Sequence, residues 1–259
     1  QEKAGVATIM MNTLRNNAEK STARIKNTHA DKIGGVSAEL QALRSSLPDP
    51  SKMKFGFSPS SLHKGKIMFD ATGINFSHDG QPLWPGGLAV QIRSGERIAL
   101  KGANGSGKTT LLKMICGQLD SETATIHRAE HSSVYIDQNY SLIDDALDVY
   151  EQARQFNGSG LQEHEIKIWL SRFLFTPEDW NKRCRALSGG ERLRLVLCCL
   201  VINEQSPDMI LMDEPTNNLD IQNLEILTAA LNEYRGTLIV VSHDDYFLEQ
   251  IGIERSIRL

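Results

Sequence analysis

The 259-residue sequence predicts an α/β fold built on a mostly parallel β-sheet. Residues 97–101 read as a short strand, and a glycine-rich loop separates them from a helix over residues 109–117 that ends at a glycine. Residues 208–213 form a continuous apolar run bounded by acids, and residues 237–242 form a third strand. Runs of this kind are typical of parallel strands that are buried on both faces.

The loop after the first strand reads Gly-Ala-Asn-Gly-Ser-Gly-Lys-Thr-Thr and matches the pattern G-x-x-x-x-G-K-[ST]. Its glycines allow successive N–H groups to point inward as an anion nest, and the helix that follows turns its positive end to the same point. Lys108 adds a full charge, and the Thr109 hydroxyl suits Mg²⁺ that arrives with phosphate oxygens. The loop predicts a nucleotide-phosphate site whose candidate residues are Gly102, Asn104, Gly105, Ser106, Gly107, Lys108, Thr109 and Thr110.

Charged side chains follow the other two predicted strands. Asp213 and Glu214 stand at the carboxyl end of the strand over 208–213, and the strand over 237–242 leads to His243. In open α/β sheets ligands bind outside this edge of the strands. We therefore expect these three side chains to meet the phosphate loop in one crevice.

Four motifs in one order resemble the ATP-binding-cassette (ABC) superfamily. They are the phosphate loop, Leu187-Ser-Gly-Gly-Glu191, Asp213-Glu-Pro-Thr-Asn-Asn-Leu-Asp220 and Ser242-His-Asp244. The resemblance covers about residues 64–259 and implies a P-loop NTPase cassette with a RecA-like, mostly parallel sheet, an antiparallel β subdomain and a helical subdomain. We assign about residues 141–186 to the helical subdomain, because apolar residues recur there at helical spacing, namely Ile166, Trp169, Leu170, Phe173 and Leu174.

The same resemblance implies ATP and Mg²⁺ as ligands and gives roles to particular residues. Glu214 would activate or orient water, His243 would contact the γ-phosphate, and Gln138, after a predicted strand over 134–136, would sense that phosphate. Mg²⁺ would be held by Thr109, Gln138 and Asp213, and adenine would stack on His78 rather than on Phe76. A further set would act on the nucleotide of an opposite cassette: Ser188, Gly189, Gly190 and Asp220.

Within the superfamily the sequence looks like the ABC-F branch, whose members have two cassettes in one chain, no membrane domain and an action on the ribosome. Glu191 replaces the glutamine common in transporters, the run from Glu214 to Asp220 is close to the branch's usual one, and a basic segment precedes the cassette. The resemblance implies a cytoplasmic translation factor or a protein that protects ribosomes from antibiotics. The alternatives are the ATPase motor of a transporter and a binding module without turnover, the latter disfavoured by the presence of Glu214 and His243.

Residues 1–50 form a predicted helical arm ahead of the cassette over residues 51–259. An apolar seam of coiled-coil spacing runs through Ile33, Val36, Leu40, Leu43 and Leu47 and requires a partner helix. These 50 residues hold seven of the 28 Lys and Arg but five of the 32 acids, which leaves 21 against 27 for the cassette.

The resemblance identifies this arm with half of the helical hairpin that reaches into the ribosome in ABC-F proteins. Candidate contacts with RNA phosphates are Arg15, Lys20, Arg24 and Lys26, and the alternative for each is a solvated helix face. Because the sequence starts at Gln1 with a seam that lacks its partner, we expect a fragment whose first cassette is missing. The partner cassette would be in the same full-length chain or in a homodimer.

The remaining composition is that of a globular domain. The sequence has no stretch near the 18 apolar residues needed to span a bilayer, which does not distinguish the branch from transporter ATPase subunits. The four cysteines lack metal-site spacing and are expected to be reduced, buried thiols. His127 and His131, four residues apart, are interpreted as solvated rather than as a metal pair.

Overall fold

The computed structural model describes residues 55–58, 62–78, 81–121 and 124–259. The chain divides into two units, Gln1–Asp49 and Pro50–Leu259, and every described residue belongs to the second. The arm predicted over residues 1–50, with its candidate RNA contacts, lies outside the described residues.

A five-stranded parallel sheet forms the centre of the cassette. Its strands are β5 (Arg97–Lys101), β7 (Ser133–Ile136), β8 (Met209–Asp213), β9 (Thr237–Val241) and β10 (Arg255–Arg258). They lie in the order β10-β5-β9-β8-β7 and pair in parallel throughout. Every residue of β8 and β9 is buried, which confirms the interpretation of their apolar runs as strands covered on both faces.

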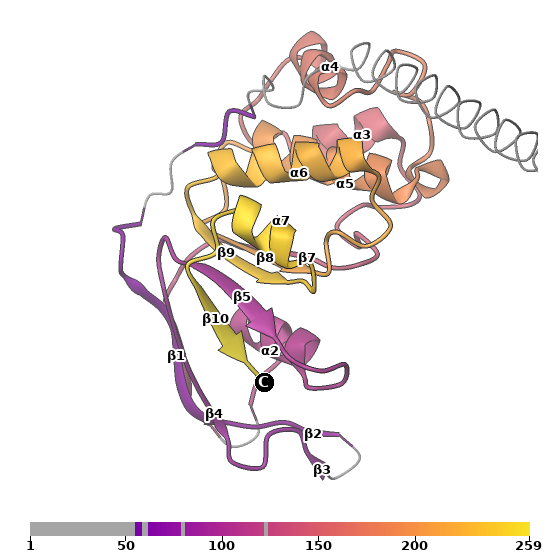
Figure 1. The fold of residues 1–259 in the computed structure, drawn as a ribbon. Helices are drawn as coiled ribbons and strands as arrows, with labels where there is room; N and C mark the ends of the chain where they lie inside the picture. Colours follow the sequence, from indigo (N-terminus) through magenta and orange to yellow (C-terminus); the bar gives the residue numbers. More distant parts are fainter. Residues whose placement is uncertain (1–54, 59–61, 79–80, 122–123) are drawn as a thin grey trace, which may run out of the picture. The chain divides into compact units, whose positions relative to one another are not determined.

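The two faces of this sheet are covered by different elements (Figure 1). Alternate residues such as Ile210 and Val240 pack against α5 (Gly189–Ile202), α6 (Ile221–Glu233) and α7 (Asp245–Gln250). Their neighbours, such as Leu211 and Val241, pack against α2 (Lys108–Ile115) and an antiparallel sheet. The helix predicted over 109–117 thus exists, and it begins one residue earlier and ends at Ile115.

The antiparallel sheet consists of β1 (Ile67–Ile74), β4 (Leu88–Arg93) and β6 (Ile126–Arg128) in the order β4-β1-β6. A separate two-stranded ribbon, β2 (Ser77–His78) and β3 (Gln81–Pro82), lies between β1 and β4 in the chain. The residues that follow this ribbon, Leu83 and Trp84, lie against Gly107 of the phosphate loop.

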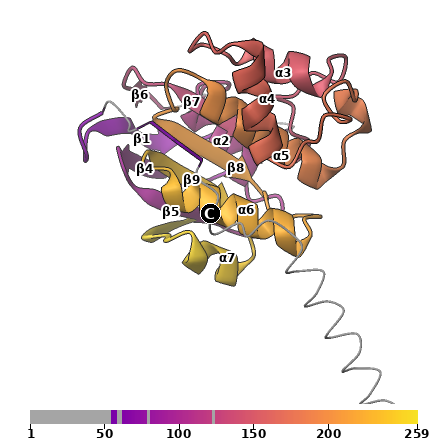
Figure 2. The same ribbon diagram turned by 90° about the horizontal axis from the view of Figure 1, so that it is seen from above.

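The helices α3 (Val149–Gln155) and α4 (Glu163–Arg172) and the short 3₁₀ helix η2 (Cys184–Ala186) fall within residues 141–186 (Figure 2). Ile166, Leu170 and Phe173 are buried there, as their spacing predicts, whereas Trp169 and Leu174 are only partly buried. The helix ends at Arg172, and Leu174 has a left-handed backbone with φ 64°, so the apolar spacing runs past the end of the helix.

The cysteines required one correction. All four are free, and Cys184, Cys198 and Cys199 are buried, but Cys116 is only half-buried because it caps the carboxyl end of α2. His127 is exposed on β6, and the Nδ1 atom of His131 lies 2.6 Å from the carbonyl oxygen of Ala129. In the part of the chain that the structure describes, no helix is both long and apolar enough to cross a membrane.

Candidate functional site

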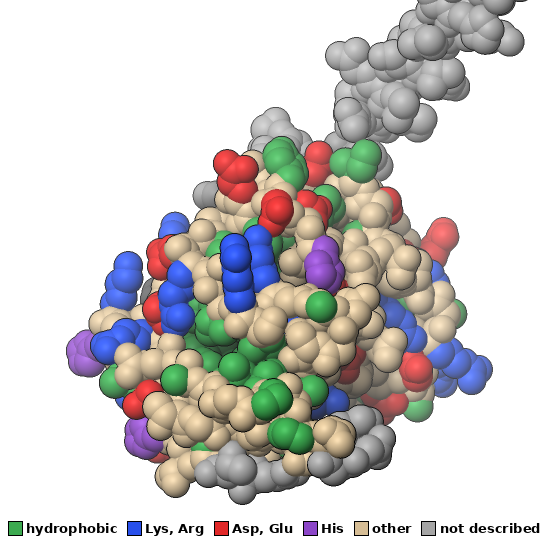
Figure 3. Space-filling model, turned by 60° about the horizontal axis from the view of Figure 1, so that its bottom comes forward, with side chains coloured by type: hydrophobic (Ala, Val, Ile, Leu, Met, Phe, Trp, Pro, Cys, Tyr) green, Lys and Arg blue, Asp and Glu red, His purple; other side chains and the backbone are tan. Residues whose placement is uncertain are grey.

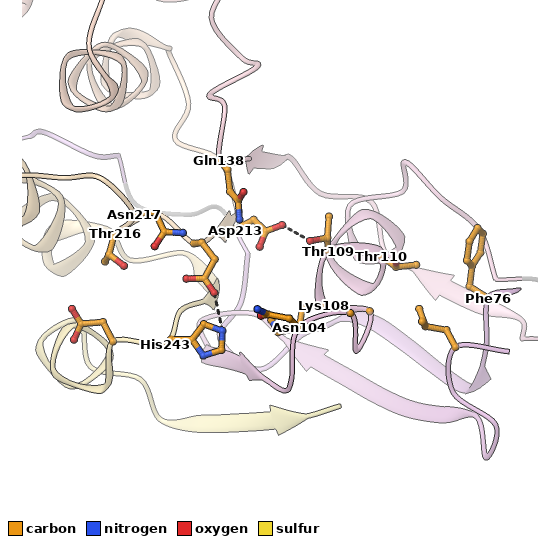
Figure 4. A pocket seen from close by; sticks show the side chains of 15 residues that line it. Phe76, Asn104, Lys108, Thr109, Thr110, Gln138, Asp213, Thr216, Asn217 and His243 are labelled. Atoms are coloured by element: carbon orange, nitrogen blue, oxygen red, sulfur yellow. Dashed lines mark hydrogen bonds and ion pairs between the residues drawn. The ribbon is translucent and has the colours of Figure 1, made fainter. Parts of the chain in front are cut away.

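A cavity of about 870 Å³ lies where the phosphate loop meets the carboxyl ends of the central strands (Figure 4). It brings together residues that are more than a hundred positions apart in the sequence, as the crossover of parallel strands predicts. The lining residues are Phe76, Leu83, Asn104, Gly105, Gly107, Lys108, Thr109, Thr110, Gln138, Asp213, Glu214, Thr216, Asn217, His243 and Asp244.

The phosphate loop has the backbone that its glycines were expected to allow. Gly105 and Gly107 have φ angles of 80° and 93°, in the left-handed region that other residues rarely adopt. The Nζ atom of Lys108 donates to the carbonyl oxygens of Gly102 at 2.9 Å and Ala103 at 3.0 Å, which holds the loop closed around its own lysine. Gly102 and Ser106 stand outside the described lining of the cavity, and they lie close together, since a Cβ atom on Gly102 would be 2.6 Å from Oγ of Ser106.

Asp213 is the centre of a hydrogen-bond network at the end of β8. Its Oδ2 atom accepts from the hydroxyl of Thr109 at 2.6 Å and from that of Tyr135 at 3.2 Å. Burial, together with the charge of Asp213, raises the pKa of Tyr135, so this phenol keeps the proton that it donates. Tyr135 was not predicted, although its register opposite Leu211 places it on the same sheet face as Asp213.

Thr109, Asp213 and Gln138 offer the oxygen atoms that Mg²⁺ prefers. The first two are in direct contact, and the side chain of Gln138, which follows the neighbouring strand β7, points toward Asp213 (Figure 4). These residues therefore fit a magnesium ion that enters with a nucleotide.

Glu214 projects into the cavity from a strained position. Its backbone is left-handed with φ 51°, and its N–H donates to the carbonyl oxygen of Val241 at 2.9 Å, which fastens it to the end of β9. Its Oε1 atom lies 3.3 Å from Nε2 of His243, whose side chain is 62% exposed compared with 11% for Glu214. Burial raises the pKa of Glu214, and the charge of Asp213 adds to this, whereas His243 opposes it.

The other end of the cavity is apolar. Phe76 lies there, far from His243 and Asn217, and Leu83 contributes the second apolar side chain (Figure 4). His78 belongs to β2, but its side chain is outside the described part of the chain, so its assignment to adenine stays a prediction. Sequence reasoning gave no role to Leu83, Thr216, Asn217 or Asp244, although the last three flank predicted residues in the chain.

The motif Leu187-Ser-Gly-Gly-Glu191, here called the signature, lies with Asp220 at the start of two helices. Ser188 is the N-cap of α5, where it exchanges hydrogen bonds with Glu191, and Asp220 is the N-cap of α6. The two ends touch, since a Cβ atom on Gly190 would lie 2.2 Å from Nδ2 of Asn223, which itself donates to Asp220. The described lining of the cavity includes none of the four predicted residues, namely Ser188, Gly189, Gly190 and Asp220.

Comparison with known proteins agrees with this geometry. Residues 86–217 match the family model described as ABC transporter. The chain is 31% identical over 254 residues to the probable ATP-binding protein YbiT of Escherichia coli O157:H7, covering 97% of this chain and 46% of the relative. It is 37% identical over 197 residues to the ATP-binding protein Uup of Escherichia coli K12, covering 73% of this chain and 30% of Uup.

A plant relative and a solved structure extend the comparison. The chain is 34% identical over 202 residues to ABC transporter F family member 5 of Arabidopsis thaliana, covering 77% of this chain and 29% of that protein. It thus spans less than half the length of these curated relatives. A dimeric ATP-binding cassette solved in a post-hydrolysis state with ADP and Pi shares the fold, with a TM-score of 0.60 and 20% identity over 74% of this chain and 94% of that chain.

Proposed function

Because this chain belongs to the ABC transporter family and is an ATPase cassette of the ABC-F type, we propose that it is one half of a two-cassette protein that hydrolyses ATP and acts on the ribosome. The observation that carries the hydrolytic part is the cavity itself. It joins a phosphate loop, the Thr109–Asp213 pair and the Glu214–His243 pair, and each occupies the strand edge where α/β proteins bind ligands.

Phosphoryl transfer to water requires charge neutralisation and an oriented nucleophile. Lys108 and the N–H groups of the loop would bind the phosphates, and Mg²⁺, when bound by Thr109, Asp213 and Gln138, would supply further positive charge. Glu214, which projects into the cavity beside His243, would accept a proton from water or orient it. His243, exposed and 3.3 Å from Glu214, would contact the γ-phosphate.

The position of the signature residues supports a site shared between two cassettes. Ser188 begins α5 and the N–H groups of its first turn are suited to a phosphate, yet none of these residues lines the cavity of its own cassette. A second cassette would bring such a helix end over the bound nucleotide. The partner is the other half of the full-length chain or, for this chain alone, a second copy.

Action on the ribosome rests on the ABC-F resemblance and on the charge of the arm. Residues 1–50 carry seven Lys and Arg against five acids, whereas the cassette carries 21 against 27. An acidic body repels RNA, so the arm is the part of this chain suited to contact it, through residues such as Arg15, Lys20, Arg24 and Lys26. Either a translation factor or a protein that protects ribosomes from antibiotics fits this chemistry.

The test uses the full-length protein with Glu214→Gln and the same change in its other cassette. This variant should keep ATP bound in the closed form, and it should co-sediment with ribosomes in ATP but less so as salt rises. The matched control is a full-length variant that keeps Glu214 and carries only Glu225→Gln, at an exposed position of α6. It should neither trap ATP nor enrich on ribosomes. Failure of the trapped variant to bind ribosomes at low salt, with capture by a membrane-domain partner, would replace this proposal with the transporter motor.

A further inference from the structure

Trp84 touches the phosphate loop although it lies outside every motif of the sequence. Its side chain is 6% exposed, and its indole Nε1–H donates to the carbonyl oxygen of Ser106 at 2.9 Å. Ser106 is the residue before Gly107, which is the N-cap of α2 and lines the cavity. A buried tryptophan usually finds a partner for its N–H, but here the partner belongs to the loop that would hold the phosphates.

The direction of this hydrogen bond has a consequence for Gly107. The carbonyl of Ser106 and the N–H of Gly107 belong to one planar trans peptide unit, so the two groups point in opposite directions. Trp84 binds the carbonyl from the protein side, and the N–H of Gly107 is thereby turned away from Trp84. An anion nest requires inward N–H groups, and a carbonyl turned inward would repel phosphate oxygens.

The indole ring of Trp84 is held by packing against the loop as well as by its hydrogen bond. A Cβ atom on Gly107 would lie 2.6 Å from Cζ2 of Trp84 and 2.5 Å from Cδ2 of Leu83, so both side chains press directly on the loop. Gly107 also has φ 93°. The backbone angle and the lack of space both require glycine here, and the lack of space comes from residues 83 and 84.

The backbone of Trp84 is held in turn by Asn75. The Oδ1 atom of Asn75 accepts from the N–H of Phe76 at 2.9 Å and from that of Trp84 at 3.0 Å. The N–H of Leu83 donates to the carbonyl oxygen of Phe76 at 2.8 Å. The apolar end of the cavity and the support of the phosphate loop are therefore one connected piece.

We propose that Trp84 is a positioning residue for nucleotide binding, whose indole N–H holds the peptide unit between Ser106 and Gly107 so that the Gly107 amide faces the phosphates. The inference rests on the proposed ATP binding and deepens it. It also assigns a chemical target, because Trp84 acts on the affinity for the phosphate chain.

The experiment compares Trp84→Phe with Trp180→Phe, a tryptophan of the helical subdomain, by calorimetric titration with Mg·ATP and by displacement of a fluorescent nucleotide with Mg·tripolyphosphate. Trp84→Phe should lower the affinity for both ligands by the same factor, roughly tenfold. The carbonyl of Ser106 loses its donor, and the peptide unit between Ser106 and Gly107 is then free to turn. Trp180→Phe should leave both affinities unchanged. KM should rise more than kcat falls, since the catalytic carboxylate is untouched.

A second variant separates the hydrogen bond from packing. Replacing Trp84 by 3-benzothienylalanine keeps the shape of the ring and removes the N–H, so it should reproduce the loss seen with Trp84→Phe even where the phenylalanine variant is less stable. Equal affinities of wild-type and benzothienyl protein for both ligands would overturn the inference, as would a loss confined to Mg·ATP. Absence of Mg·ATP binding by the wild-type protein would instead refute the proposed function.

Discussion

Arg97 illustrates how a single residue holds separate elements together. Its guanidinium donates to the carbonyl oxygens of Leu231 at 2.8 Å and Tyr234 at 2.6 Å, at the end of α6, and to that of Ile251 at 2.6 Å, at the end of α7. Both helix ends present unsatisfied carbonyls and a negative dipole end. Burial lowers the pKa of Arg97 because it removes the cation from water, and the charge of Arg235 lowers it further.

Replacing Arg97 with Met should lower the free energy of unfolding by about 2 kcal/mol, because three carbonyls lose their donor. Arg97→Lys should recover only part of this, since an ammonium lacks the planar fork that reaches three acceptors. Urea denaturation measures the change, with Arg154→Met on the exposed face of α3 as the control. Equal stability of Arg97→Met and the control would show that water forms hydrogen bonds with these three carbonyl oxygens as favourably as the guanidinium does.

Glu214 shows what the sequence can and cannot predict about one residue. The motif predicted its role, but nothing in the sequence indicated its left-handed backbone, which occurs together with a hydrogen bond from its N–H to the distant Val241 on β9. In the two-cassette protein, Glu214→Gln with the same change in the other cassette should lower kcat by roughly 10² to 10⁴ while ATP affinity stays within about twofold. Single-turnover experiments measure the rate of hydrolysis, and equilibrium titration measures the affinity for ATP. A parallel loss of rate and affinity would mean that Glu214 binds the nucleotide rather than activating water.

At the scale of elements, the start of α5 has a physical reason for its glutamate. Glu191 completes the capping box with Ser188 and pairs with Lys182, whose Nζ atom lies 2.7 Å from Oε1. Burial by itself would raise the pKa of Glu191, but the hydrogen bonds from Lys182 and from the Ser188 amide outweigh it, so the pKa lies below the ordinary value. Glu191 is thus part of a local network that holds the start of α5.

The stability difference between the wild-type protein and Glu191→Gln should depend on pH in a defined direction. A lowered pKa in the folded state stabilises the fold above the ordinary glutamate pKa of about 4.3, and this contribution is lost as the pH falls through the lowered value. Because the pair is partly exposed, we expect only about 0.5 kcal/mol at pH 7. Urea midpoints at pH 7 and at about pH 3, well below the ordinary glutamate pKa, test this, and a difference that grows at low pH would contradict it.

The elements that the sequence predicted well are those whose pattern reflects burial. β8 and β9 are buried on both faces and therefore consist of unbroken apolar runs. The ribbon of β2 and β3 has only two residues in each strand, too few for any period to be visible. The apolar end of the cavity, which flanks this ribbon, was therefore not predicted. Trp84 was missed for a different reason, because its role depends on a contact with Ser106, 22 residues away in the sequence.

At the scale of the whole molecule, the described residues on the face shown in Figure 3 include both signs of charge, with Asp and Glu side chains lying among the Lys and Arg side chains. This agrees with the excess of acids over residues 51–259. Deleting residues 1–50 from the full-length trapped variant should therefore reduce ribosome binding and flatten its dependence on salt. Pelleting at several salt concentrations measures both, and an unchanged salt dependence would move the RNA contact to another part of the protein.

The central claim is that a complete catalytic site needs two cassettes, and complementation between copies of this chain tests it most directly. Lys108→Ala removes the phosphate loop's charge, and Ser188→Arg blocks the signature, so each variant alone should be inactive. Mixed at high concentration, they should recover about a quarter of wild-type turnover, because half of the dimers are mixed and each has one intact site. Wild-type turnover per cassette should likewise rise with protein concentration. No recovery on mixing, together with a fast, concentration-independent wild-type rate in a demonstrated monomer, would contradict the account.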